Sequence, residues 1–492
     1  MPIFDQFPYT NFHDLNLDWI IDAVKDVKDN IDTTAENAAI ATEQANIATE
    51  QAAIATAAAS KIKYINVKDY GAVGDGLTDD SDAIIDALMA NNTEKTIVYF
   101  PTGTYIVSKP IRVYSETVLY FDNATIKVFR NNNDFRQLSF CLGEYNNASF
   151  ASAYDGVHDV QFINLKFDGG YNALYTTTNN GGGNIGLNHC KNILFKNCEF
   201  YNMVNDHYID VAGSQNVLIN NCIFHDTVVL GSGVYEAVNI DWSSNTGFPH
   251  FGSFDNTPCL DVIISESKFY NLKYTSAGIG THYMPTGADA HRRVKIINND
   301  FHDMSRVIRL INALDSIITG NNMANCADFD NSEAEKFAVW LNSCSGSLFT
   351  NNVCRDFIYG VIKVENYGGS DTSMATAIQV NDNIMNVVNT SLSGTAIRIR
   401  KVQGFQMNNN IIRRAGRMAL NLSDAEDLEV CNNNFPDSAS SIDTNIMYNG
   451  NLTRFKIILN QTNATGKTMC ALYGTNTNGL RQDNYSATFT TV

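Results

Sequence analysis

The sequence predicts an all-β protein whose central part is a solenoid of stacked coils. Three observations favour this fold. A template of apolar residues around a polar corner, V-x-I-x-x-N-x-F, recurs over residues 157–436. The spacing of its copies mostly matches one coil of ~20–30 residues. Only 17% of the 492 residues are charged, whereas 61 are Asn, which suits repeated polar corners and not a Lys/Glu-rich helical protein.

Residues 20–60 are expected to form a helix, because Ala is frequent and Gly and Pro are absent. Ile40, Ile47 and Ile54 follow one another at intervals of seven, and a strict seven-residue repeat predicts a left-handed supercoil with partner helices. The sequence therefore predicts a helical trimerisation segment within residues 1–62. The alternative is a single solvated helix.

Residues 63–156 are expected to form the N-terminal cap and first turns of the solenoid. A short strand and a Gly-rich turn precede an amphipathic helix, with Ala83, Ile84, Ala87 and Leu88 on one face. Two stretches that alternate in the manner of strands follow, TIVYFPTGTYIV and TVLYFDNATIKVF.

Within residues 157–436, each coil is expected to close on an apolar residue. These closing residues are Phe167, Phe200, Phe224, Phe269, Phe301, Met323, Val353, Met385, Ile412 and Phe435. Two positions earlier stand Asn299, Asn321, Asn351, Asn383, Asn410 and Asn433. Amides stacked every ~4.8 Å can bond to the coils on either side, so a buried Asn ladder is predicted. Cys198 and Cys222 hold the same position in earlier coils and are interpreted as small buried fillers, not a disulfide. Residues 437–492 are expected to form a C-terminal β cap.

A second set of short strands is expected to present two outward columns of side chains, because alternate residues of a strand face opposite sides. The first column contains Gly186, Asp210, Asn239, Gly280, Arg309, Trp340, Lys363, Arg398 and Asn421. The second contains Asn188, Ala212, Asp241, His282, Ile311, Asn342, Glu365, Arg400 and Ser423. This face carries carboxylates at one end and cations with a Trp further along.

Several function classes are excluded or disfavoured by composition. The net charge of −18 disfavours a protein that coats nucleic acid. No apolar run reaches the ~18 residues of a membrane span, and the polar, aromatic N-terminus does not resemble a signal peptide. The ten Cys include no CxxC pair, so neither a zinc site nor a disulfide framework is predicted, and synthesis in a reducing cytoplasm is expected. No cofactor is predicted.

Two stretches resemble known families. VKDYGAVGDGLTDDSDAI followed by VYFPTGTY resembles the opening of the pectate-lyase-like right-handed parallel β-helices of phage tailspikes. EAVNIDW, FPHFG, DNTPC, AGIGTHY and VKIINNDF, from about 235 to 302, resemble the pre-neck appendage proteins of short-tailed phages that infect Gram-positive bacteria. NFHDLNLDWI resembles the virion-attachment ends of such proteins. The large relatives carry a self-cleaving chaperone domain at the C-terminus, whereas this sequence ends about 55 residues after the last repeat.

The resemblance implies a right-handed single-stranded parallel β-helix that assembles as a homotrimer. It also implies a virion tail appendage, made in the host cytoplasm, that contacts phage tail or neck proteins through its N-terminus. Such proteins bind and depolymerise wall polysaccharide or teichoic acid.

Five residues are candidates for hydrolytic chemistry, which needs one protonated and one ionised carboxyl. Asp210 and Asp241 lie one coil and two residues apart in the outward columns, or roughly 8 Å, within the ~6.5–9.5 Å of an inverting pair. His282 lies one coil from Asp241 and is placed to orient or protonate it. Glu236 belongs to the resemblance but has inward parity, unless a corner turns it outward. Asp255 lies in the longest interval between closing residues. Each acid has the alternative role of capping a turn.

A basic strip is the candidate for substrate binding. It comprises Arg309, Lys363, Arg398 and Arg400 with Trp340, and Trp242 of the EAVNIDW stretch is added to it. A Trp face stacks on sugar rings, and Arg binds phosphate or carboxylate through two bonds. A trimer interface is the alternative, because Arg and Trp are enriched there too.

The sequence therefore predicts a glycan-binding and glycan-hydrolysing appendage. Two other functions stay open. A polysaccharide lyase would need a uronic acid substrate, a basic residue for the C5 proton and usually calcium. An adhesin would bind through the same carboxylates without any chemistry.

Overall fold

The computed structural model describes residues 38 and 41–51 and most of 63–491. The gaps in the latter range are 91–94, 130–138, 144–152, 172–182, 229–234, 245–253, 273–276, 327–336, 358–359, 367–373, 388–394, 414–417, 437–443, 450–451, 459, 463–467, 474–475 and 483–487. The chain divides into two units, 1–62 and 63–492. In the first unit, residues 41–51 are helical and Ile47 is 46% exposed. Ile40 and Ile54 lie outside the described residues. None of the described helices is long and apolar enough to cross a membrane.

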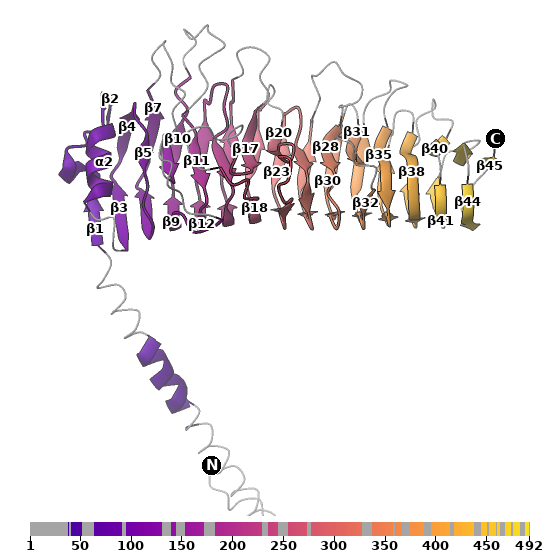
Figure 1. The fold of residues 1–492 in the computed structure, drawn as a ribbon, viewed down its shortest axis with the longest axis horizontal. Helices are drawn as coiled ribbons and strands as arrows, with labels where there is room; N and C mark the ends of the chain where they lie inside the picture. The colour runs from indigo at the N-terminus through magenta and orange to yellow at the C-terminus, as the bar shows by residue number, and fades with distance from the viewer. Residues whose placement is uncertain are drawn as a thin grey trace, which may run out of the picture. The chain divides into compact units, whose positions relative to one another are not determined.

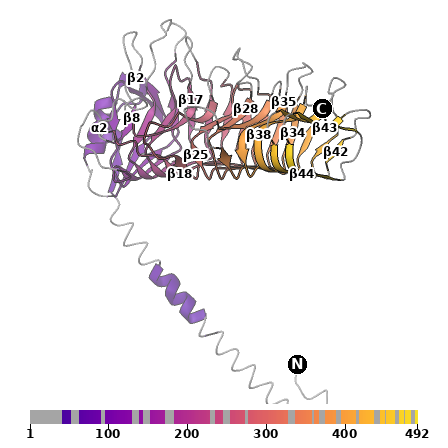
Figure 2. The same ribbon diagram turned by 45° about the vertical axis from the view of Figure 1, so that its right-hand side comes forward.

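The second unit is a parallel β-helix. Its strands lie side by side along one axis, from β1 at one end to β45 at the other (Figures 1 and 2). All the strand pairings in the described residues are parallel, and each coil adds strands to three ladders. The predicted fold class is therefore confirmed for this unit.

The first ladder, here called the site ladder, carries the two outward columns. Its strands are β5 (Ile111–Arg112), β8 (Phe140–Leu142), β11 (Ile185–Asn188), β14 (Ile209–Ala212), β17 (Glu236–Asp241), β20 (Ala277–Thr281), β24 (Ile308–Ile311), β28 (Phe337–Asn342), β31 (Gly360–Glu365), β35 (Thr395–Gln403), β38 (Met418–Cys431), β40 (Thr444–Asn449), β43 (Thr468–Tyr473) and β45 (Thr488–Thr491).

The second ladder follows the site ladder in each coil. It contains β1 (Lys63–Asn66), β3 (Thr96–Phe100), β6 (Thr117–Phe121), β9 (His158–Ile163), β12 (Lys191–Lys196), β15 (Gln215–Asn220), β18 (Leu260–Ser265), β22 (Lys295–Ile297), β26 (Ile317–Thr319), β29 (Leu348–Thr350), β33 (Gln379–Asn381), β36 (Gln406–Asn408), β41 (Leu452–Ile458) and β44 (Asn476–Gln482). The short strand β21 (His291–Arg292) pairs with β18 and with β25 (Ala313–Leu314). The short strand β32 (Ala375–Thr376) pairs with the end of β35, and the second half of β38 lies between β36 and β41.

The third ladder forms a separate sheet. It contains β2 (Asp75–Asp79), β4 (Gly103–Val107), β7 (Ala124–Val128), β10 (Lys166–Asp168), β13 (Glu199–Tyr201), β16 (Ile223–His225), β19 (Lys268–Tyr270), β23 (Asp300–His302), β27 (Asn322–Ala324), β30 (Val353–Phe357), β34 (Ile384–Val387), β37 (Ile411–Arg413), β39 (Asn434–Phe435) and β42 (Gln461–Thr462).

The core lies between the ladders and is stacked in the same way as the strands. The closing residues Phe200 and Phe224 have ring centroids 4.7 Å apart, and Phe224 stacks on Phe269 at the same distance. Phe269 and Phe301 continue the column at 4.8 Å. Stacked rings bury a large apolar area at every coil, which explains why the template requires an apolar residue there.

A helix lies at the first end of the solenoid. The helix α2 (Ser81–Met89) buries Ile84, Ala87 and Leu88, as predicted, and follows a 3₁₀ turn, η3 (Val67–Tyr70). These apolar side chains join the core of the first coils. They cover the end of that core, which would otherwise face water.

The predicted Asn ladder is present, with one correction. The Oδ1 atom of Asn352, not Asn351, accepts from the backbone nitrogen of Asn321 at 3.1 Å and from its Nδ2 at 3.0 Å. Asn351 is exposed and has a left-handed backbone, with φ of 56°. The coil closes on Cys354, which pairs with Met323, and not on Val353. The error arose because three residues, Asn351, Asn352 and Val353, fit the template in two registers.

The complete ladder runs through Asn299, Asn321, Asn352, Asn383, Asn410, Asn433 and Asn460, all buried. From Asn321 onward each Oδ1 accepts two bonds from the asparagine of the coil before it, whereas Asn299 Oδ1 accepts one, from the Ser267 backbone nitrogen. Cys198 and Cys222 are buried and not joined to each other.

The parallel ladders continue through the expected C-terminal cap. β40 pairs with β38, β43 with β40 and β45 with β43, all in the site ladder. The coils therefore do not end at Phe435, and the described strands of 437–492 extend the solenoid.

Candidate active site

The strand register confirms the alignment of the first column, and that of the second column up to Asp241 and again from Ile311 onward. Asp210 pairs with Asn239, Asn239 with Gly280, and Gly280 with Arg309. The same column continues through Trp340, Lys363, Arg398 and Asn421. In the second column Ala212 pairs with Asp241, so Asp210 and Asp241 are one strand and two residues apart, as expected.

The outward face is less open than the sequence suggests. Asp210 is 4% exposed, Asn239 1% and Asp241 3%. The acids therefore do not line an open groove, and a charged or polar group here needs protein partners or a ligand. In the described part of the chain Asn239 Oδ1 has no hydrogen-bond partner.

Asp210 belongs to a group of side chains here called the acid cluster, which comprises His207, Asp210, Glu236, Asp241 and His282. Its Oδ1 accepts a hydrogen bond from Asn239 Nδ2 at 2.9 Å. Burial raises the pKa of this carboxyl well above its usual range, and the nearby Asp241 raises it further. Of the two aspartates, Asp210 is therefore the one that holds a proton more readily.

Asp241 and His282 form the best-defined polar pair. His282 Nδ1 lies 2.9 Å from Asp241 Oδ2, and the Trp242 backbone nitrogen donates to Oδ1 at 2.8 Å. Burial acts to raise the pKa of Asp241, but the hydrogen bond from His282 and its charge bring that pKa below the ordinary value. Burial acts to lower the pKa of His282, but the hydrogen bond to Asp241 and the negative charge of the nearby Glu236 carboxylate raise it to about 10.

Glu236 joins this cluster despite its inward parity. It is the first residue of β17 and is fully buried. Its Oε2 lies 3.6 Å from His282 Nε2, and its Oε1 lies 3.4 Å from Arg309 Nη1. A Cβ at Gly280, which belongs to the outward column, would lie 2.5 Å from Glu236 Cγ. The start of the strand therefore lets Glu236 turn outward, and the glycine leaves the space that it occupies.

Two residues of the site were not among the sequence candidates. His207 stands just before β14 and was not singled out in the sequence, yet its Nδ1 lies 3.6 Å from Glu236 Oε2. Tyr283 is 55% exposed and faces the Arg309 guanidinium at 5.8 Å. Tyr283 directly follows His282 in the AGIGTHY stretch, and this position in the sequence could have identified it as a residue of the site.

The predicted basic strip is present but tightly packed. Arg309 and Lys363 both lie over the Trp340 ring, at 5.4 and 5.0 Å from its centroid. Trp340 is 7% exposed, and Lys363 forms an ion pair with Glu365 at 2.5 Å. Trp340 therefore does not present a free face to a sugar. Arg398 and Arg400, in β35, are half-buried.

The side chains of two other candidates contact residues outside the cluster. Trp242 is fully buried, its ring centroid lies 3.7 Å from that of His291, and its Nε1 donates to the Asp289 carbonyl at 2.8 Å. It packs within the protein and is not placed to bind substrate. Asp255 accepts from the Thr257 backbone nitrogen at 2.9 Å and lies 3.5 Å from His189. These contacts match the turn-capping alternative.

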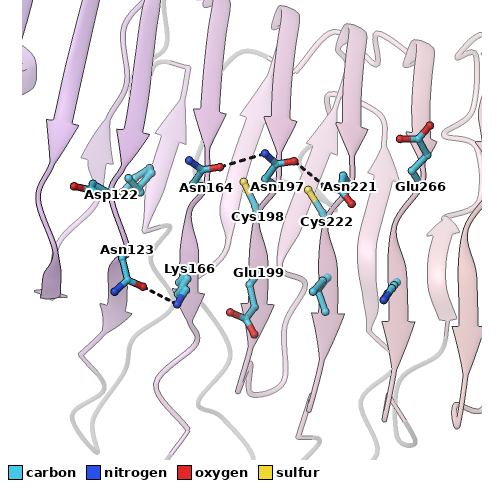
Figure 3. Close-up of a pocket in the computed structure, with 13 residues that line it drawn as sticks. Asp122, Asn123, Asn164, Lys166, Asn197, Cys198, Glu199, Asn221, Cys222 and Glu266 are labelled. Carbon is cyan, nitrogen blue, oxygen red and sulfur yellow. Dashed lines mark hydrogen bonds between the residues drawn. The ribbon is translucent and has the colours of Figure 1, made fainter.

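A separate hollow of about 490 Å³ lies at the corner between the second and third ladders (Figure 3). Corner amides line it in a row, with Asn197 donating to Asn164 at 3.3 Å and Asn221 donating to Asn197 at 2.9 Å. Lys166 and Glu199 stand beside them. None of its lining residues belongs to the acid cluster.

Comparison with known proteins agrees with this architecture. Residues 64–149 match the family model described as rhamnogalacturonase A/epimerase, pectate lyase-like. The surface adhesin PfbA of Streptococcus pneumoniae has a similar structure, with a TM-score of 0.61 and 22% identity over 83% of this chain and 93% of that chain. Tailspike protein 3 of bacteriophage CBA120 gives a TM-score of 0.52 and 13% identity over 86% of this chain and 62% of that one. These likenesses establish the fold.

Two curated relatives share sequence with the chain. It is 29% identical over 280 residues to the plasmin and fibronectin-binding protein A of Streptococcus pneumoniae, covering 52% of this chain and 38% of that protein. It is also 29% identical over 201 residues to the pre-neck appendage protein of Bacillus phage phi29, covering 33% of this chain and 23% of that protein. The chain thus spans less than two fifths of either relative. The resemblance to phage tailspikes and pre-neck appendage proteins, inferred from motifs, is confirmed.

Proposed function

We propose that this chain belongs to a virion tail appendage that binds and hydrolyses a bacterial surface glycan, either a wall polysaccharide or teichoic acid. The sequence similarity to a phage pre-neck appendage protein and the structural similarity to a tailspike support the location. The observation that carries the chemistry is the register that sets Asp210 and Asp241 one strand and two residues apart, with different partners.

The two carboxyls suit the two roles of an inverting hydrolase. Asp210, whose pKa is raised by burial, donates its proton to the leaving oxygen as the glycosidic C–O bond breaks. Asp241 accepts a proton from the attacking water. His282 orients the Asp241 carboxylate through the 2.9 Å contact between Nδ1 and Oδ2. Glu236 holds His282 from the other side and is the alternative acid. Asp255 is the least supported of the five candidates.

The glycan reaches this cluster from the side of His282, whose side chain is 38% exposed. Tyr283 offers the exposed ring beside it. Further along the ladder, Arg398 and Arg400 are the strip residues best placed for anionic groups of the polymer.

Two rival functions have support. The similarity to an adhesin and to a fibronectin-binding protein favours binding without cleavage. A lyase remains the other candidate, because Arg309 lies 3.4 Å from Glu236 and would act as the basic residue.

Assembly and attachment belong to the same proposal. Residues 1–62 attach to tail or neck proteins and associate as a trimer, in which the exposed Ile47 is buried against partner helices. Sedimentation of the full chain should then give three times 54.3 kDa. A monomer at all concentrations would contradict the trimer.

The test of function is incubation of the protein with purified walls, followed by mass spectrometry of the soluble products. New reducing ends or phosphate monoesters indicate hydrolysis, and unsaturated products absorbing near 235 nm indicate a lyase. Binding without products indicates an adhesin.

Variants make this test specific. Asp210→Asn and Asp241→Asn should each lower the rate by several orders of magnitude while the protein stays folded. Asp300→Asn is the matched control, because Asp300 also accepts from a neighbouring Asn, at 2.7 Å, but lies in the third ladder. Full activity in both site variants would exclude this pair. Loss only in Glu236→Gln would move the chemistry to Glu236 and Asp241.

A further inference from the structure

Three side chains of the acid cluster are arranged as metal ligands. One ligand atom each from His207, Glu236 and His282 lies within 4.8 Å of the others. The 3.6 Å between His282 Nε2 and Glu236 Oε2 exceeds the ~2.7–3.2 Å of a hydrogen bond. It is close to the ~3.4 Å that separates two ligands of a tetrahedral ion with bonds of ~2.1 Å. The spacing therefore fits an ion between them.

The imidazole of His282 is held by its other nitrogen. His282 Nδ1 contacts Asp241 Oδ2 at 2.9 Å, which leaves Nε2 directed to Glu236. His207 is fixed by the backbone of Glu236, because its Nδ1 lies 2.8 Å from the Glu236 carbonyl oxygen, and the same nitrogen lies 3.6 Å from Glu236 Oε2. Metal-binding histidines usually have such a carboxylate or carbonyl partner, because it fixes the tautomer and the ring orientation.

Glu236 is placed by the surrounding fold. Gly280 leaves room for its side chain, and Arg309 contacts Oε1, so that Oε2 is the oxygen that faces the histidines. Glu236 is fully buried, whereas His282 is 38% exposed. An ion at this position would have three protein ligands and one side toward solvent, which is the arrangement of catalytic metal sites.

We propose that His207, Glu236 and His282 bind one divalent first-row transition-metal ion, for which zinc is the best match, and that Asp241 orients His282 for it. Two imidazoles and one carboxylate suit zinc, iron or nickel better than magnesium or calcium. The site uses no Cys and draws on three distant parts of the chain, so cysteine spacing gives no sign of it. Metal binding does not depend on the proposed cleavage.

Metal binding by the full-length protein tests this. The protein is stripped with a chelator, dialysed and titrated with Co²⁺, whose visible absorption reports tetrahedral ligation, and then with Zn²⁺ in competition. One ion per chain is expected. His207→Ala and His282→Ala should each weaken binding at least 100-fold, and Asp241→Asn should weaken it about 10- to 100-fold. His302→Ala should bind as the parent does, because His302 pairs with Asp303 in the third ladder.

A second measurement guards against variants that fail to fold. Zn²⁺ should raise the thermal unfolding midpoint of the parent and of His302→Ala but not of His282→Gln. The proposal is overturned if no cobalt spectrum appears, or if His207→Ala binds as tightly as His302→Ala. Either result would mean that His207, Glu236 and His282 do not form a metal site. If metal-free protein cleaves glycan, the proposed hydrolysis is supported and does not need the metal. If the protein binds metal but cleaves no glycan, only the metal site is supported.

Discussion

Asn239 donates its side-chain amide to Asp210 across one strand spacing, at 2.9 Å, and both side chains are buried. The amide occupies Oδ1 of the carboxyl, so the other oxygen is the one available for a proton. Because the Asp210 carboxyl is buried, its charge state should affect the stability of the protein more than that of an exposed acid would.

The free energy of unfolding should depend on the charge of Asp210. Because burial raises its folded pKa above the unfolded value, the folded state binds the proton more tightly. The resulting stabilisation is present at low pH and is lost as pH rises from the unfolded pKa of ~3.9 through the raised folded pKa. Asp210→Asn should therefore raise the thermal midpoint more at pH 8 than at pH 5. Equal shifts at both pH values would contradict the raised pKa.

The Asn ladder gives a test with a neighbouring control. Asn352→Leu removes the acceptor of two donors on Asn321, its backbone nitrogen and Nδ2. Each buried group left without a partner costs about 1–3 kcal/mol. Urea denaturation should show a loss of several kcal/mol for Asn352→Leu. Asn351→Leu should change stability far less, because that side chain is exposed. Similar losses in both variants would mean that the ladder does not run through Asn352.

The glycine that makes room for Glu236 is a test of the site itself. Gly280→Ala places a Cβ 2.5 Å from Glu236 Cγ, so the carboxylate must move. Overpacking of this kind costs about 1–3 kcal/mol. Stability measured in urea should fall by that amount, and any activity or metal binding of the cluster should fall with it. If both are unchanged, Glu236 is not held against Gly280.

The two aromatic residues beside Arg309 should behave differently. Trp340→Ala removes a buried ring between two cations and should destabilise the protein by about 3–5 kcal/mol in urea denaturation. Tyr283→Ala removes an exposed ring, so stability should hardly change. Glycan affinity, measured by calorimetry on solubilised wall polymer, should fall roughly two- to tenfold in Tyr283→Ala because a stacking contact of ~0.5–1.5 kcal/mol is lost. If Trp340→Ala lowered glycan affinity and left stability unchanged, Trp340 would be the residue that stacks on the sugar.

The register of the site ladder could be predicted from the sequence because a strand has a fixed period of two. The pairing of Arg309 with Trp340, and of Lys363 with Arg398, follows from aligning short apolar strands. The same alignment failed at Asn351 and Asn352, because adjacent asparagines satisfy the template equally well and only burial separates them.

The chemistry around Glu236 could not be derived from alternation. Its side chain leaves the pattern at the first residue of a strand, and the space that receives it is created by a glycine in the next coil. His207 was missed for the same reason, since it precedes β14. The burial of Asp210 and Asp241 was also missed, because column alignment tells which side of a strand a residue faces and not what covers that side.

The Asn ladder makes the coils interchangeable. Asn321, Asn352 and Asn383 offer the same two donors and the same acceptor, and each is bonded to the coils directly before and after it. A segment running from one such asparagine to the next can therefore be copied or removed while every junction still joins equivalent atoms. Insertion or deletion of whole coils in the gene would therefore change the length of the solenoid in steps of one coil, each of about 4.8 Å.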